Sequence, residues 1–137
     1  MAANLTIRDG RRIYLSTVSL MGVYVLVAEE LMESHPRFAR WLAVVAERDA
    51  VFMSIDLRAV SDEEAEAFEQ AAVVAYRKLV SKVGVDGGEN HFARSGLARL
   101  AMTLGADVPL PDGMKALPDE FDGPCLVQGY DFDELWK

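Results

Sequence analysis

The sequence contains very little cysteine: Cys125 is the single thiol among 137 residues. A lone cysteine cannot form an internal disulfide, and unpaired cysteines are typical of proteins in reducing compartments. A chain of this length buries roughly two thirds of the surface that its unfolded form exposes, so folding requires neither a disulfide nor a metal ion. These observations predict a single compact domain over residues 1–137, a cytoplasmic location and no cofactor.

An excess of basic side chains is also missing, because 22 acidic residues outnumber 14 basic ones and give a net charge of −8. Nucleic-acid binding depends on lysine and arginine to replace phosphate counterions, so the composition predicts no nucleic-acid partner. The acidic excess is local. Residues 1–60 hold seven basic and seven acidic side chains, whereas residues 61–137 hold seven and fifteen, and residues 105–137 alone hold two and eight. A basic protein is therefore the expected partner.

No uncharged run is long enough to cross a membrane. The longest candidate covers residues 13–28 and follows Arg11 and Arg12, as the apolar part of a signal peptide would. It is shorter than the ~20 residues that a spanning helix needs, and hydroxyl residues and Gly22 interrupt it. The sequence predicts no membrane partner; it leaves open whether residues 13–28 form a strand followed by a helix or one helix.

The N-terminal residues predict a β-hairpin. Asp9-Gly10 stands between two β-prone segments, and both residues tolerate the positive φ angles of a two-residue type I′ turn. Such a loop places Leu5 opposite Tyr14 and Ile7 opposite Arg12, so that neither face of the hairpin is fully apolar.

Two helices are predicted next. Hydrophobic residues recur at steps of three and four from Leu20 to Leu31, and this helix is expected to end near Ser34 because Pro36 disfavours helical backbone at the residue before it. Pro36 suits the first turn of the second helix, which should pack antiparallel to the first. The second helix is expected to bury Phe38, Trp41, Leu42 and Val45.

The middle of the chain predicts a strand and a long helix. Alternating hydrophobic residues over 51–57 predict a strand with one buried face. Ser61 and Glu64 form a capping box at the start of a helix over 61–83, and Gly84 is its stop signal. The length of this helix predicts that it is the central one, and its alanine-rich stripe predicts close packing against a neighbour. The acidic run Asp62-Glu63-Glu64-Glu66-Glu69 is interpreted as a cap and a solvated face.

A shorter helix over 90–104 is expected to turn Phe92, Leu97, Leu100 and Leu104 inward. Four of the five prolines then fall within an irregular, acidic segment over 105–137. The predicted fold class is α+β and predominantly helical, with about four helices, an N-terminal β-hairpin and one or two short additional strands.

The residues that could carry catalysis are few. His35 and His91 each follow a glutamate at a spacing of two, whereas side chains that share a helix face lie three or four apart. Cys125 has no local nucleophile signature, and no glycine-rich phosphate loop is present. The prediction is therefore no catalytic residue, no cofactor-binding residue and no metal ligand.

The C-terminal residues mix aromatic rings with carboxylates, a composition that solubility alone does not require. Aromatic anchors surrounded by carboxylates suit the recognition of a basic partner, and this predicts partner-binding residues. The alternative is that Phe132 and Trp136 anchor a last helical turn to the core. The predicted partner-binding residues are Tyr130, Asp131, Asp133, Glu134 and Trp136.

These predictions are compatible with three alternative functions. The first is a non-enzymatic acidic protein-binding module, in its sharpest form an inhibitor that masks a basic partner such as a toxin nuclease; bacterial immunity proteins are similar in size and charge, with no shared motif. The second is a small enzyme that uses His91 with nearby carboxylates or Cys125. The third is a homo-oligomeric adaptor that pairs through the helix at 61–83 and would leave an apolar stripe exposed there.

Overall fold

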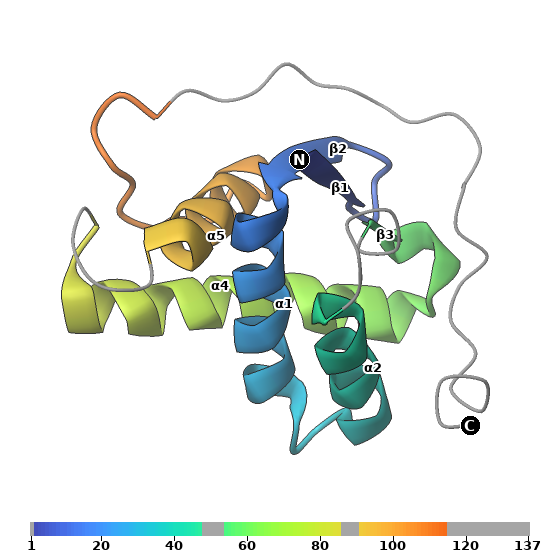
Figure 1. Ribbon diagram of the computed structural model, residues 1–137. Helices are drawn as coiled ribbons and strands as arrows, with labels where there is room; N and C mark the ends of the chain where they lie inside the picture. Colours follow the sequence, from blue (N-terminus) through green and yellow to red (C-terminus); the bar gives the residue numbers. More distant parts are fainter. Residues whose placement is uncertain (1, 48–53, 86–90, 115–137) are drawn as a thin grey trace.

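The computed structural model describes residues 2–47, 54–85 and 91–114 (Figure 1). Within these ranges the chain forms four α-helices and a small three-stranded sheet, so the predicted α+β, mainly helical class is confirmed. In Figure 1, α1 (Thr17–Leu31) stands upright with α2 (Pro36–Ala46) beside it, and α4 (Asp62–Val83) runs across behind it. Strands β1 and β2 lie near the upper end of α1 in this view. The fourth helix, α5 (His91–Thr103), packs against both α1 and α4.

The N-terminal hairpin is present, but its register differs by one residue from the prediction. Strand β1 (Ala2–Thr6) pairs antiparallel with β2 (Arg12–Ser16), and Leu5 lies opposite Ile13. The loop has three residues, because Gly10 N–H bonds to the Ile7 carbonyl and Ile7 N–H bonds to the Arg11 carbonyl, with φ of 97° at Gly10 alone. This is a type I turn with a glycine bulge. The shift places two buried side chains opposite each other and gives the hairpin an apolar face.

Residues 13–28 form a strand followed by a helix, which answers the question that the sequence left open. Ser16 ends the hairpin and caps α1, its Oγ accepting a hydrogen bond from the Ser19 N–H at 3.2 Å. Helix α1 ends at Leu31, close to the predicted end, and α2 begins at Pro36 as predicted. All four side chains predicted to be buried by α2 are buried, namely Phe38, Trp41, Leu42 and Val45.

The predicted strand over 51–57 is shorter among the described residues, and residues 51–53 lie outside them. Strand β3 (Ile55–Asp56) pairs parallel with β1, and Leu57–Ala59 form a 3-10 turn, η1. The alternation over 51–57 puts Asp56 on the face opposite the hydrophobic residues, which was expected to be solvated, but Asp56 is buried. The reason is its partner: Arg58 Nη2 lies 2.6 Å from Asp56 Oδ2, and the Arg58 N–H donates to Oδ1 at 2.9 Å. Asp56 thereby caps η1, and its buried carboxylate is paired with the Arg58 guanidinium.

Helix α4 begins and ends where its capping signals predicted. Ser61 Oγ accepts from the Glu64 N–H at 3.1 Å and donates to Glu64 Oε1 at 2.8 Å, so the capping residues are joined twice. Gly84 closes the helix with a φ of 80°, a conformation that favours glycine.

Replacing Ser61 by alanine removes the oxygen that satisfies the Glu64 N–H, and we expect a loss of about 1 kcal/mol of unfolding free energy. Chemical denaturation of Ser61→Ala and Ser61→Thr measures this. Threonine keeps the acceptor and should stay close to the wild type. Equal losses in both variants would mean that the cap is not what stabilises this end of α4.

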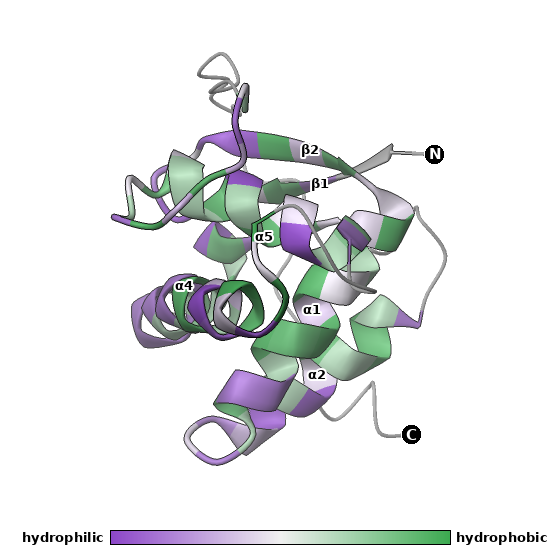
Figure 2. Ribbon diagram, turned by 90° about the vertical axis from the view of Figure 1, so that its left-hand side faces the viewer, coloured by the Kyte–Doolittle hydropathy of each residue, from purple (hydrophilic) through white to green (hydrophobic). Residues whose placement is uncertain are grey.

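The central helix is α1 and not α4, contrary to the prediction from length. α1 packs against each of the other three helices, and it is hydrophobic along most of its length (Figure 2). α4 packs mainly on α1 and α5. The alanine stripe of α4 is buried within the chain, whereas Val74 on the same helix is 40% exposed. The prediction chose the longest helix, but the central position depends on how many sides of a helix are apolar. α1 is apolar nearly all round and therefore needs neighbours on more sides than an amphipathic helix does.

Helix α5 buries Leu97 and Leu100 as predicted, but Phe92 is 55% exposed. Phe92 and Leu97 are five residues apart, so on a helix with 3.6 residues per turn they lie on different faces. The inward position in the first turn belongs to Ala93, whose Cβ packs on Gly22 of α1. Leu104, just past the end of α5, is half-buried against the core.

Candidate functional site

The partner-binding residues predicted near the C-terminus lie outside the described residues, and so does Cys125. These are Tyr130, Asp131, Asp133, Glu134 and Trp136. The structure therefore does not place them, and that prediction stays a prediction.

The two histidines are among the described residues, and each contacts polar neighbours. His35 precedes α2, with Nδ1 2.9 Å from Ser34 Oγ and Nε2 3.5 Å from Glu63 Oε1. His91 begins α5, and its Nδ1 accepts a hydrogen bond from Arg94 Nη2 at 2.9 Å. Glu89, the glutamate two residues before His91 and one of the nearby carboxylates of the enzyme alternative, lies outside the described residues. Within the described ranges, no group of three His, Cys, Asp or Glu side chains is arranged to hold a metal ion.

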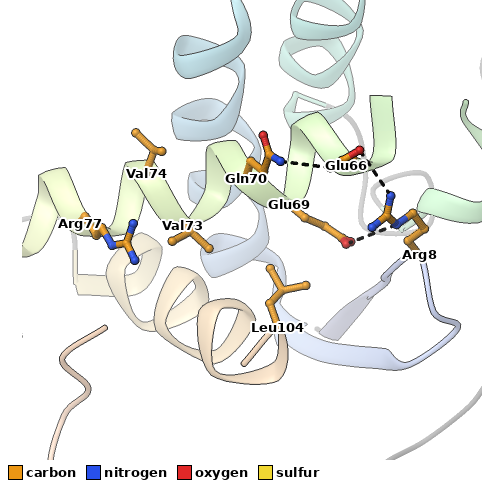
Figure 3. A pocket seen from close by; sticks show the side chains of 8 residues that line it. All are labelled: Arg8, Glu66, Glu69, Gln70, Val73, Val74, Arg77 and Leu104. Atoms are coloured by element: carbon orange, nitrogen blue, oxygen red, sulfur yellow. Dashed lines mark hydrogen bonds and ion pairs between the residues drawn. The ribbon is translucent and has the colours of Figure 1, made fainter. Parts of the chain in front are cut away.

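A groove of about 490 Å³ runs along the outer side of α4, between the hairpin loop and the end of α5. One end of the groove is acidic, the middle is apolar and the far end carries Arg77 (Figure 3). Leu104 lies beside Val73 at the apolar part, where Val73 and Val74 come from α4. Its lining residues are Arg8, Glu66, Glu69, Gln70, Val73, Val74, Arg77 and Leu104.

Glu69 is the unusual member of this set, because its carboxylate is poorly solvated and incompletely paired. Its side chain is only 14% exposed, and Oε2 is buried with no hydrogen-bond partner. Burial raises the pKa of Glu69 above its ordinary value of 4.5, although the neighbouring Arg8 acts in the opposite direction. A carboxylate in this state carries an unmet capacity to accept hydrogen bonds from a cation.

Arg8 shows what kind of group the acidic end attracts. Its Nη1 lies 3.8 Å from Glu66 Oε2, and its Nε lies 3.9 Å from Glu69 Oε1 (Figure 3). Both separations exceed hydrogen-bond length, and the Arg8 side chain is 43% exposed. Such a surface ion pair contributes little to stability. The guanidinium is therefore attracted to the carboxylates without being fixed by them.

The raised pKa of Glu69 predicts a pH dependence of stability. A carboxyl group whose pKa is higher in the folded state stabilises the fold in its protonated form, and this contribution is lost as pH rises through the folded-state value. We expect Glu69→Gln, which keeps the shape without the charge, to melt at a higher temperature than the wild type at pH 7. The difference should shrink as pH falls from the raised folded-state value toward about 4.5, below which the unfolded chain is protonated as well.

Thermal melts of Glu69→Gln and Glu66→Gln between pH 4 and 8 check this expectation. Glu66 is exposed and shows no such orphaned oxygen, so Glu66→Gln should change the pH profile much less. A lower melting temperature for Glu69→Gln at pH 7 would mean that the charged carboxylate stabilises the fold.

Sequence reasoning missed this groove, since it assigned Glu69 to a solvated helix face. A signal was available: Glu69 follows the buried Phe68 and lies four residues after the buried Ala65, so it borders the apolar stripe. Arg8 is more than fifty positions away in the sequence, and no local pattern links it to α4.

In the described part of the chain, no helix combines the length and the apolar character needed to span a membrane. Comparisons with family profiles, with curated proteins and with solved structures find no match for this chain.

Proposed function

We propose that the protein is a non-enzymatic binding module that recognises a basic segment of a partner protein. The observation that carries the proposal is Glu69, a poorly solvated carboxylate with an unpartnered buried oxygen at the acidic end of the α4 groove. Retaining this charge costs stability, as its raised pKa implies. Ionisable groups with a perturbed pKa, which lower the stability of the fold, are found mainly at functional sites.

The groove suits an arginine or a long lysine side chain. Val73 and Leu104 offer an apolar surface for the methylene stem, and Glu66 and Glu69 offer carboxylate oxygens for the charged head. A guanidinium can bond to a carboxylate through two parallel N–H groups, a geometry that Arg8 does not reach. A partner's arginine therefore gains contacts by displacing Arg8.

The acidic balance of residues 61–137 supports the same class of partner, because a negative surface speeds association with a positive one. More specifically, we propose that the protein is an inhibitor that covers the basic cleft of a toxin such as a nuclease. The residues Tyr130, Asp131, Asp133, Glu134 and Trp136 stay predicted contacts of the same basic partner.

Affinity capture from the native cell at low and high salt tests the proposal. We expect the full chain to retain a basic protein at low salt and less of it at high salt, because salt screens the attraction between exposed charges. Glu66→Gln/Glu69→Gln should retain much less than the wild type. Glu29→Gln/Glu33→Gln removes the same charge from exposed positions near the end of α1 and serves as the matched control. Equal retention by both double variants would contradict the groove as the binding site.

A further inference from the structure

Arg94 is another ionic side chain with an unpartnered buried atom, and it does not line the α4 groove. The residue is 4% exposed, and its Nη1 is buried with no hydrogen-bond partner. No carboxylate among the described residues lies within ion-pair distance of it. Because arginine does not lose its proton in proteins, the buried guanidinium stays charged, and the described residues supply no counter-ion for it.

The guanidinium lies beside the first turn of α5. Side chains of a helix point back toward its N-terminus, and Arg94 Nη2 reaches His91, the first residue of α5, at 2.9 Å. Since arginine only donates, Nδ1 of His91 accepts, and the proton of the neutral imidazole is on Nε2. The first N–H groups of a helix have no intrahelical acceptor, and they form the positive end of the helix dipole.

We propose that the first turn of α5 binds a phosphate-type oxyanion, with Arg94 as its main ligand and His91 as its second. The described groups gathered there are donors: the unpartnered Nη1 of Arg94, the Nε2–H of His91 and the N–H groups of the first turn. A tetrahedral oxyanion offers several acceptor oxygens to such a set. His91 is exposed and Arg94 is not, so rotation of the imidazole opens the guanidinium to the ligand.

This site does not rest on the proposed function, because the α4 groove is acidic and the α5 site is cationic. A loss of phosphate binding in an Arg94 variant leaves the capture experiment unaffected, and a failure of capture leaves the phosphate experiment unaffected.

Titration of the isotope-labelled full chain with inorganic phosphate, followed by NMR, tests the proposal. Sodium chloride holds the ionic strength constant. We expect saturable shifts at the amides of His91, Phe92 and Ala93 and at the Arg94 side chain. Arg94→Met should bind phosphate roughly tenfold to hundredfold more weakly, as expected for losing a hydrogen bond to a charged group. Arg99→Met removes the same charge from the same helix and should bind like the wild type.

His91→Gln changes an exposed residue and provides a second variant that should fold as the wild type does; it should bind phosphate several-fold more weakly. Shifts spread over all basic residues without saturation would overturn the proposal. A strong fall in the melting temperature of Arg94→Met in chloride buffer would overturn it as well, since that result means a carboxylate of the chain already pairs with Arg94. Replacing an unpaired buried charge by methionine should instead leave stability unchanged or higher.

Discussion

Replacing Phe68 by alanine should remove about 3–5 kcal/mol of unfolding free energy, the largest effect that we expect from a single substitution in this chain. Phe68 comes from α4 and is fully buried where three helices meet. Its ring lies 6.4 Å from that of Tyr24 in α1, edge to face, and 6.4 Å from that of Phe38 in α2. The substitution therefore removes buried apolar surface, leaves a cavity and ends two aromatic contacts.

A loss of this size is a large fraction of the stability of an ordinary domain, so Phe68→Ala should be partly unfolded near physiological temperature. Chemical denaturation measures it, with Phe92→Ala as the matched control. The control makes the same chemical change at an exposed position and should alter stability by no more than about 0.5 kcal/mol. Similar losses in both variants would place Phe92 in the core and contradict the orientation of α5.

Replacing Gly22 by alanine should destabilise the protein by about 1–2 kcal/mol, although helix propensity alone favours alanine by about 1 kcal/mol. The reason is the close contact between α1 and α5. A Cβ added at Gly22 would lie 2.6 Å from the Cβ of Ala93 and 3.1 Å from its Cα. Backbone cannot move as a flexible side chain does, so the two helices must separate.

The double variant Gly22→Ala/Ala93→Gly tests this explanation, because it exchanges the two residues across the contact. We expect it to return close to wild-type stability, even though Ala93→Gly alone should cost about 1 kcal/mol. Such a rescue is the sign of direct coupling between the two positions. A double variant less stable than either single one would mean that α1 and α5 do not meet at this point.

The sequence predicted the helices well where a local signal has one physical meaning. Ser61, Pro36 and Gly84 each act within a single turn of chain, through a capping oxygen, a fixed φ angle or a tolerated positive φ angle. The boundaries that rest on them agree with the structure. The buried stripes of α1 and α2 were equally clear, because their hydrophobic residues repeat with the helical period.

The predictions were wrong where one sequence pattern is compatible with two different local structures. Asp9-Gly10 suits a two-residue turn, but it also suits the last two positions of a three-residue loop, and that choice shifts the register of the hairpin. Phe92 was assigned inward on its hydrophobicity, whereas the small Ala93 is what the close contact with Gly22 admits. Packing between helices decides such cases, and local sequence does not encode it.

The candidate sites were the least predictable part. Glu69 and Arg94 look like ordinary surface charges in the sequence, and their burial is a property of the assembled helices. The charge count locates the acidic excess in the second half of the chain, but it could not separate a solvated glutamate such as Glu66 from a largely buried one such as Glu69.

The most direct test of the central proposal is the affinity of the purified basic partner for three charge variants at one salt concentration. Glu69→Gln should bind roughly tenfold more weakly, since it loses a hydrogen bond to a charged group. We expect this loss of affinity even though the same variant should be more stable than the wild type at pH 7. Arg8→Gln should bind more tightly, because it removes the cation that competes for the same carboxylates. Glu33→Gln should bind as the wild type does. Equal affinities for all three variants would contradict a basic-partner site in the α4 groove.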